Sequence, residues 1–272
     1  MSDNPLFSIV TVCYNSAKTI ERTIQSILKQ DEKDYEYIVI DGKSTDATID
    51  ILNKYKFKFE GRLRLTSEPD KGIYDAMNKG VRNAVGKYIW IVNSDDYISD
   101  NVLSLIKTQI IETGNNEQAI IVGGMNLIDG HMSFYATPPN HTHLVKCYCN
   151  LSMGINHPST IVPRKIYQEV GLYDDRYYIS ADIDFFLRCM NKKIDFQFIN
   201  SALTNMTMDG ISNQLPIKKN IHDWNLRYSK YCHNRLSYMY YMTRSILKIL
   251  IRKVFPARFL NKMFYRDNNS PA

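Results

Sequence analysis

Strand-like and helix-like segments alternate from the start of the chain to Asp96, and this alternation restricts the fold more than any other feature. Residues 7–13 form a continuous apolar run, as expected of a strand buried on both faces. Apolar residues then recur at helical spacing from Ile20 to Leu28. The pattern predicts strands at residues 7–13, 35–40, 63–66 and 87–92, and helices at 20–28, 45–52 and 73–84. Such alternation is typical of an α/β protein with a mostly parallel central sheet.

The rest of the chain is less regular. Strands are predicted at residues 120–123 and 132–135, and helices at 163–170 and 181–190. Beyond Pro216 the sequence becomes helical, basic and aromatic, and Asp223 is the only acidic residue from Ile217 to Arg266. We therefore expect one α/β domain over residues 1–215 and a helical basic extension over residues 216–272.

Polar side chains follow each of the first four predicted strands. Ligands of parallel sheets collect at the carboxyl ends of the strands, because loops and helix amino termini meet at that edge. Three of these four strands are followed by carboxylates, which surface loops would seldom provide by chance. The groups are Tyr14 and Asn15, residues 41–46, residues 68–72, and residues 93–96.

Asp95 and Asp96 are the best candidates for a metal site. Mg²⁺ and Mn²⁺ prefer oxygen ligands and bridge readily to phosphate oxygens. The alternative is that the two acids cap the helix that begins near Val102. Ser99 and Asp100 stand closer to that helix and can cap it instead, which favours the metal.

Several other classes of protein are excluded by missing motifs. A dinucleotide-binding Gly-x-Gly-x-x-Gly would follow the first strand, where this chain has Cys13, Tyr14, Asn15 and Ser16. A Walker loop is also absent.

The five cysteines form an odd set without a Cys-x-x-Cys pair, so we expect reduced thiols. No secretory signal is visible, which predicts a cytoplasmic protein.

Several segments form a recognisable set of motifs: residues 8–15 (Ser-Ile-Val-Thr-Val-Cys-Tyr-Asn), 39–46 (Val-Ile-Asp-Gly-Lys-Ser-Thr-Asp) and 67–80, which begins Ser-Glu-Pro-Asp-Lys-Gly. With the segments that follow, they resemble the family 2 glycosyltransferases, over about residues 7–212. Residues 93–96 (Asn-Ser-Asp-Asp) resemble the family's Asp-x-Asp metal motif. Residues 157–160 (His-Pro-Ser-Thr) and 179–188 (Ile-Ser-Ala-Asp-Ile-Asp-Phe-Phe-Leu-Arg) are similar to acceptor-side segments of its bacterial polysaccharide members.

The resemblance implies a GT-A fold, with a donor half at about residues 7–125 and an acceptor half at about 126–215. Tyr14 and Asn15 would border the nucleobase, Asp41 would contact the base or ribose, and Asp70 would lie beside them. Asp95 would bind metal and donor diphosphate, and Asp96 would bind metal. The chain departs from the pattern at two positions: many relatives have an acid where Asn93 stands, and a second acid where Gly42 stands.

Displacing a nucleoside diphosphate by a hydroxyl needs a cation for the leaving phosphates and a base for the acceptor proton. Asp182 matches the family's catalytic acid and is our candidate base; the alternative is an ordinary carboxylate at a helix start. Asp184 should point away from Asp182 and is the second choice. His157 is either a hydrogen-bonded structural residue or a contact to acceptor or diphosphate. His141 and His143 are predicted on a solvated polar loop.

The basic extension has two interpretations. Residues 245–254 are too short and too charged to span a bilayer, but an aromatic and basic helix could lie on an anionic lipid surface. Alternatively it is a solvated basic face packed on the core or on a partner. Nucleic acid is not expected, because no recognition module accompanies the basic residues.

The sequence therefore predicts a metal-dependent, inverting glycosyltransferase. It would use Mn²⁺ or Mg²⁺ to move a sugar from a nucleotide diphosphate donor to a glycan or lipid-linked acceptor, in polysaccharide biosynthesis at the inner face of the cell membrane. Two rivals remain. A nucleotidyltransferase that makes nucleotide sugars should have a glycine-rich basic loop after the first strand, and this chain lacks one. A donor-binding protein could keep the fold without catalysis.

Overall fold

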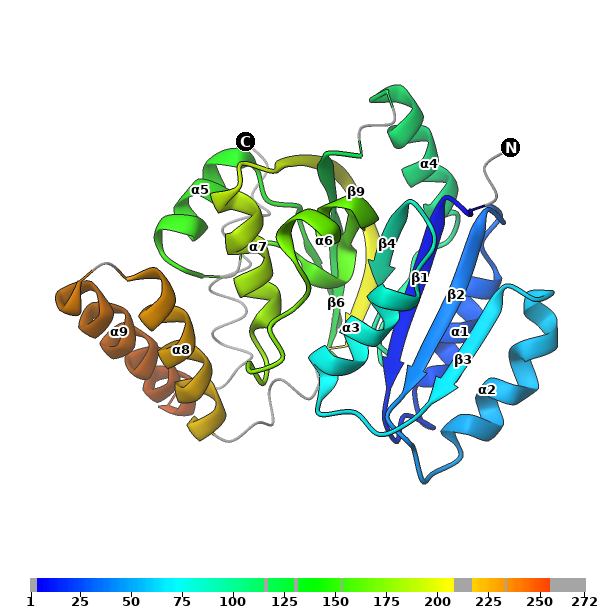
Figure 1. Ribbon diagram of the computed structural model, residues 1–272, viewed down its shortest axis with the longest axis horizontal. Coiled ribbons are helices and arrows are strands. Elements are labelled where there is room, and N and C mark those ends of the chain that lie inside the picture. Colours follow the sequence, from blue (N-terminus) through cyan, green and yellow to red (C-terminus); the bar gives the residue numbers. More distant parts are fainter. Residues whose placement is uncertain are drawn as a thin grey trace.

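A computed structural model of the protein describes residues 4–114, 117–129, 132–152, 154–207, 217–232 and 234–254; only the backbone is described at Asp129, Met132 and residues 248–254. Figure 1 shows a central sheet with helices on both of its faces and a pair of helices, α8 and α9, at one end. The sheet order in the described residues is β3-β2-β1-β4-β8-β6-β9-β5, with β7 paired to β6.

The first four predicted strands form the parallel part of the sheet, as expected. β1 lies between β2 and β4, and β3 pairs with β2, all in parallel. The observed bounds are β1 (Phe7–Cys13), β2 (Tyr35–Asp41), β3 (Leu63–Ser67) and β4 (Tyr88–Ile91). Their carboxyl ends therefore meet at one edge, which is where the candidate donor-binding residues lie.

The other part of the sheet is mixed in direction and was only partly predicted. β8 is antiparallel to both β4 and β6, β9 is parallel to β6, and β5 is antiparallel to β9. The strands predicted at 120–123 and 132–135 belong to β6 and β7, whereas β5, β8 and β9 were not predicted. The bounds are β5 (Tyr97–Ile98), β6 (Ala119–Asp129), β7 (Met132–Ala136), β8 (Thr160–Pro163) and β9 (Asp195–Thr207).

Each face of the sheet has its own hydrophobic core, which explains the continuous apolar run of β1. Ile9 and Tyr37 pack toward one layer of helices, while their neighbours Val10 and Ile38 pack toward the other. The first layer contains α1 (Ile20–Leu28), α2 (Thr48–Lys56), the short 3-10 helix η1 (Phe57–Phe59) and α4 (Val102–Glu112). The second contains α3 (Ile73–Asn83), α6 (Arg164–Val170) and α7 (Ala181–Asn191).

Two local predictions were wrong. The segment of His141 and His143 is a helix, α5 (His141–Cys149), because Asn140 caps it by accepting the His143 N–H at 2.8 Å. Neither Ser99 nor Asp100 caps α4, whose N-cap residue is Asn101, without a side-chain cap bond. The Leu103 N–H of α4 instead donates to Gln30 Oε1, 3.2 Å away on the chain segment after α1.

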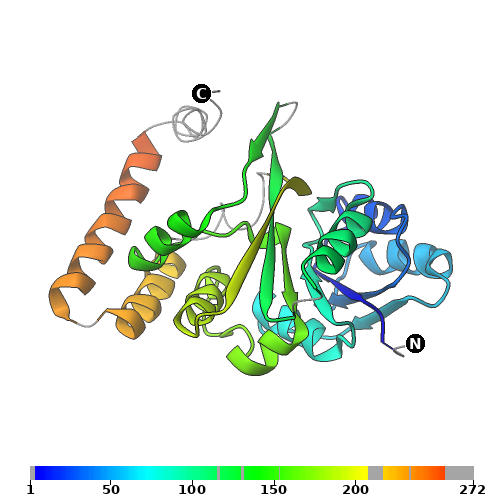
Figure 2. The same ribbon diagram turned by 90° about the horizontal axis from the view of Figure 1, so that it is seen from above.

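The extension is helical where the structure describes it. It consists of α8 (Ile217–Tyr231) and α9 (Arg235–Val254), which Figures 1 and 2 show beside α7 and α5, far from β1, β2 and β3. The predicted boundary at residues 215–216, the end of the resemblance near residue 212, and the basic side chains from residue 248 onward lie outside the described residues. Among the described residues, every helix is too short or too polar to span a bilayer.

Candidate functional site

The loop after β1 is hydrogen-bonded to the loop after β2. The Asn15 N–H donates to Ser44 Oγ at 2.8 Å, and the Thr45 N–H donates to Asn15 Oδ1 at 2.9 Å. The Ser16 N–H donates to Thr48 Oγ1 at 2.8 Å. Asn15 itself has a left-handed backbone, with φ of 50°. The predicted donor-binding residue Asn15 is thus fixed to the segment that follows Asp41.

Asp41 lies at the end of β2 and has no exposed surface. Its Oδ2 accepts the Ser44 N–H at 2.9 Å and the Ser67 hydroxyl at 2.6 Å. Its Oδ1 accepts the Ser44 hydroxyl and the Cys13 thiol, the latter at 3.6 Å. Burial, and secondarily the charge of Asp41, raise the pKa of the Cys13 thiol. Asp41 therefore joins the ends of three strands, and a contact of its carboxylate with a base or ribose stays a prediction.

The side chains of Tyr14 and Asp70 both lie close to Gly42 at this edge. A Cβ added to Gly42 would lie 2.5 Å from Asp70 Oδ2 and 3.4 Å from Tyr14 Cδ2. A side chain at this position would therefore require the Asp70 carboxylate to shift. Tyr14 is 60% exposed. Burial raises the pKa of Asp70, although its carboxylate accepts the Gly72 N–H at 3.0 Å.

The loop after β4 lies against the loop after β1. Ser94 Oγ is 2.8 Å from Ser16 Oγ. The Thr23 hydroxyl, on α1, donates to the carbonyl oxygens of Ser94 and Asp96 at 3.1 and 2.6 Å. The loops that carry Asn15 and Asp95 are therefore neighbours, as the predicted donor site requires.

The carbonyl oxygen of Asp95 is held from two sides. Arg22 Nη2 on α1 donates to it at 2.9 Å, and Thr207 Oγ1 at the end of β9 donates to it at 3.1 Å. One of these residues belongs to the predicted donor half and the other to the acceptor half. The loop after β4 is therefore fixed where the two halves meet.

Asp96 is a buried carboxylate that lacks a strong cationic partner in the described residues. It is 2% exposed, and burial together with the charge of Asp95 raises its pKa to about 7. Asn93 Nδ2 donates to Asp96 Oδ2 at 3.2 Å, while the buried Asn93 Oδ1 has no hydrogen-bond partner there. A divalent cation would neutralise the carboxylate and could use the Asn93 oxygen, so these residues fit one.

Asp95 is the other residue of the predicted metal pair. Burial raises its pKa as well, and the opposing effect of Arg22 is smaller. Among the described residues, no group of three His, Cys, Asp or Glu side chains could hold a metal ion. A cation at this loop would therefore need oxygen ligands from its substrate, as Mg²⁺ commonly does when it binds phosphates.

Asp182 is the second residue of α7 and is 8% exposed. Tyr74, on α3, donates its hydroxyl to Asp182 Oδ1 at 3.2 Å. Tyr74 follows Asp70 by four residues, so this bond ties Asp182 to the edge that carries Tyr14, Gly42 and Asp70. Burial raises the pKa of Asp182, and the nearby His157 opposes that shift.

His157 lies in a buried aromatic cluster at the start of the 3-10 helix η2 (His157–Ser159). Its Nε2 is 3.1 Å from the Tyr173 hydroxyl, and its ring meets those of Tyr173 and Phe186 edge-on. Burial lowers the pKa of the His157 ring, and the charge of Asp182 opposes that shift. These contacts are those of a structural histidine, while a contact of His157 with acceptor or diphosphate stays untested.

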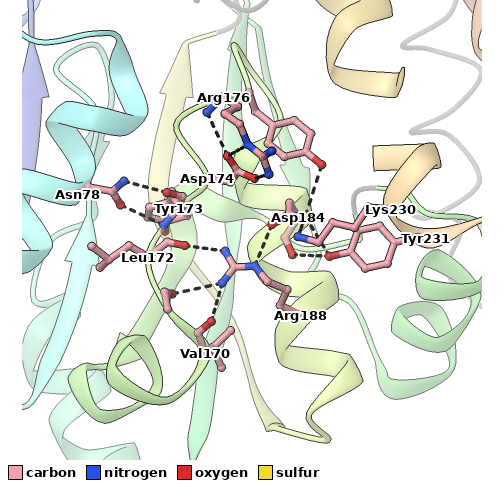
Figure 3. Close-up of polar contacts among 12 residues, drawn as sticks. Asn78, Val170, Leu172, Tyr173, Asp174, Arg176, Asp184, Arg188, Lys230 and Tyr231 are labelled. Carbon is pink, nitrogen blue, oxygen red and sulfur yellow. Dashed lines mark hydrogen bonds and ion pairs between the residues drawn. The ribbon is translucent and has the colours of Figure 1, made fainter. Parts of the chain in front are cut away.

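Asp184 is fully buried and forms ion pairs with two basic side chains. Figure 3 shows its carboxylate between Arg188 Nε, at 2.8 Å, and Lys230 Nζ, at 2.6 Å. The Tyr231 hydroxyl donates at 2.9 Å to Asp184 Oδ1, which is also the oxygen that Lys230 contacts. Arg188 also donates to the carbonyl oxygens of Val170 and Leu172. Asp184 is therefore engaged in joining α7 to α8 and to the segment before α7.

Three residues around Asp182 were missed by sequence reasoning. They are Tyr74, which donates to it, and Asp223 and Arg227, which are 1% and 4% exposed on α8. One signal was present for Asp223, because a single acid within a long basic stretch needs a reason. Arg227 and Tyr74 carried no such signal.

The chain belongs to the family described as Glycosyl transferase family 2, whose model matches residues 8–171. A PGL/p-HBAD biosynthesis glycosyltransferase of Mycobacterium tuberculosis is 29% identical over 218 residues, which cover 79% of this chain and 82% of the relative. The uncharacterized glycosyltransferase MJ1057 of Methanocaldococcus jannaschii is 28% identical over 223 residues, covering 80% and 76%. The protein is accordingly a glycosyltransferase.

Solved structures with the same architecture show that the fold is GT-A. TarS of S. aureus superposes with a TM-score of 0.66 at 19% identity, over 94% of this chain and 45% of that chain, so this chain spans less than half of TarS. The mannosyltransferase PcManGT from Pyrobaculum calidifontis, solved with GDP-Man and Mn2+, gives a TM-score of 0.63 at 13% identity, over 96% of this chain and 80% of that one.

Proposed function

We propose that the protein transfers a sugar from a nucleotide diphosphate donor to an acceptor hydroxyl with inversion, using Asp182 as the base. The observation that carries the proposal is the bond between Asp182 and Tyr74, because it links a buried carboxylate to the donor edge. Tyr14, Asn15, Asp70 and Asp41 would form the nucleoside side of that edge.

The transfer is a single displacement. The acceptor oxygen attacks the anomeric carbon and forms the new glycosidic bond, while the bond from that carbon to the diphosphate oxygen breaks. The acceptor proton passes to the carboxylate of Asp182, whose raised pKa makes it a stronger base than an exposed aspartate. Attack from the face opposite the leaving group gives inversion.

A divalent cation, Mn²⁺ or Mg²⁺, would neutralise the charge that develops on the leaving diphosphate. Asp95 and Asp96 would hold it, assisted by the unpartnered Asn93 Oδ1. The Mn2+ bound with GDP-Man in PcManGT supports this choice of cation.

The acceptor is proposed to be a glycan or a lipid-linked glycan in surface polysaccharide biosynthesis. The relatives named for PGL/p-HBAD biosynthesis support an acceptor of this kind. Helix α9 supports a peripheral contact with the inner face of the cell membrane, since Leu236, Met239, Tyr240 and Leu247 are exposed along it. Met239, Tyr240 and Leu247 line an open apolar hollow there, together with Thr243 and Arg244.

The proposal is tested by a panel of nucleotide sugars with Mn²⁺, scored for release of nucleoside diphosphate and for transfer to acceptors. We expect one donor to be consumed by the wild-type protein, and Asp182→Asn to bind that donor normally while losing about 100-fold or more of its turnover. Donor binding is measured by calorimetry.

Asp175→Asn is the matched control, because it makes the same chemical change on an exposed residue of the preceding loop. It should behave as the wild type does. Nucleotide binding without consumption of any donor would identify a donor-binding protein instead. Unchanged turnover in Asp182→Asn would remove Asp182 from the mechanism.

A further inference from the structure

Helix α8 contacts the turn that leads into α7, immediately before Asp182. The carboxylate of Asp223 accepts the Tyr178 N–H at 2.9 Å and the Ile179 N–H at 2.8 Å. It also accepts the Ser180 hydroxyl at 3.0 Å. Three consecutive residues are therefore bound by one side chain that comes from the basic extension.

These bonds replace the usual cap of α7. Ser180 is the N-cap residue of α7, yet its side chain makes no cap bond within the helix. Its hydroxyl donates to Asp223 instead. A negative charge near a helix amino terminus is stabilising, so Asp223 stabilises from outside the end of the helix that carries Asp182.

Helix α8 makes a second contact with α7, at Asp184, two residues after Asp182. Lys230 and Tyr231, in the last turn of α8, donate to Oδ1 of Asp184 at 2.6 and 2.9 Å. Asp182 lies between Ser180 and Asp184 along the chain, and both neighbours are bound to the same helix. Helix α8 thus fixes α7 immediately before and after the candidate base.

Charge and burial distinguish Asp223 from an incidental surface contact. It is 1% exposed, and an isolated buried carboxylate is costly unless its oxygens are paired. Arg227 lies one turn further along α8, is also buried, and interacts electrostatically with Asp182. Within the described residues its Nε and Nη1 atoms have no hydrogen-bond partner. Helix α8 therefore brings both an anchoring acid and a cation close to the candidate base.

We propose that α8 belongs to the catalytic centre, with Asp223 as the positioning residue that sets the place of the Asp182 carboxylate. This rests on the proposed role of Asp182 as the base. Displacement of a reacting group by about 1 Å can cost about 100-fold in rate, so the three bonds of Asp223 bear directly on turnover. The donor edge around Asn15 and Asp95 receives no bond from Asp223, so donor binding should not depend on it.

The test compares Asp223→Asn with the wild-type full-length chain. An asparagine keeps the shape but can accept through one oxygen only. We expect kcat to fall about 10- to 100-fold, with the dissociation constant of the consumed nucleotide sugar changed less than about twofold. With fewer bonds holding the start of α7, water should reach Asp182 more easily and lower the pKa of its carboxyl toward the ordinary value. The acid limb of the kcat/KM profile should then move to lower pH.

Ser180→Ala keeps the experiment decisive if Asp223→Asn does not fold. It removes one of the three bonds and should give a smaller fall in kcat with the same direction of pH shift. Lys218→Ala, on the exposed start of α8, is the matched control and should leave kcat and the pH profile unchanged.

The outcomes separate this inference from the proposed function. A wild-type chain that consumes no donor would overturn the proposed function itself. Normal kcat and an unmoved acid limb in folded Asp223→Asn would overturn only the positioning role. Equal losses of donor affinity and turnover would do the same, since they indicate a general structural role.

Discussion

At the scale of single residues, the loop after β4 contacts the loop after β1 through Ser94 and Ser16. Asp95 and Asp96 lie in this loop, after a strand, as the sequence pattern predicted. Their unequal burial could not be predicted, because it depends on contacts from α1 and β9, which are distant in sequence. The same holds for the bond between Asp182 and Tyr74, whose residues are 108 positions apart.

The raised pKa of Asp96 predicts a pH-dependent effect of Mn²⁺. The folded chain holds the Asp96 proton more tightly than the unfolded chain does, so the contribution of Asp96 to metal-free stability should fall as pH rises from about 4 to about 7. Protons and Mn²⁺ compete for the carboxylate, so added Mn²⁺ should raise the Tm more at pH 8 than at pH 5.5. Differential scanning fluorimetry measures both.

Asp96→Asn provides the comparison. Removing the buried charge should weaken the pH dependence of the metal-free Tm and abolish most of the Mn²⁺ effect. Equal stabilisation by Mn²⁺ at both pH values, or in both proteins, would place the cation away from Asp96.

At the scale of elements, the buried parallel strands were predictable because their apolar runs are short and continuous. β1 was predicted with its exact observed bounds. β9 was missed because much of it is only half-buried and it mixes polar with apolar residues, so no single periodicity marks it. Helix α5 was missed because its histidines suggested a loop, although Asn140 is a good N-cap residue.

Helix α9 carries the proposed membrane contact, and it can be tested without removing the helix. Leu236→Glu combined with Leu247→Glu places two acids on its exposed apolar side. We expect this variant to lose most of its flotation with vesicles that contain anionic lipid, because it reduces both apolar burial and attraction to the lipid charge.

Ser229→Glu, on an exposed position of α8, controls for added charge and should still float. If the Leu236 and Leu247 double variant floats as well as the wild type, α9 is not the membrane contact.

At the scale of the whole molecule, the sequence separated a catalytic domain from an extension near residue 216, and the described contacts cross that boundary. Asp223 binds the turn before α7, and Tyr228 packs with Leu151 and Leu187. The composition changes sharply at Pro216, but composition records neither of these contacts. The boundary at residues 215–216 stays a proposal, and α8 makes contacts with the domain before it.

Two truncations test how the extension is divided. A chain that ends at Cys232 keeps α8 and should retain most of its Tm and its donor binding. A chain that ends at Pro216 loses the acceptor for the Tyr178 and Ile179 N–H groups, and it should lose more stability, by about 2 kcal/mol or more. Chemical denaturation of both chains measures this. Equal stability would mean that α8 adds nothing to the domain.

The carbonyl oxygen of Asp95 accepts hydrogen bonds from both predicted halves of the domain. It receives one hydrogen bond from Arg22 and another from Thr207. Its loop follows β4, the strand that pairs in parallel with β1 on one side and antiparallel with β8 on the other. A change in either donor would move the same peptide group. Kinetic effects of altering Arg22 and Thr207 should therefore be non-additive, and each should change the apparent affinities for sugar nucleotide and acceptor together.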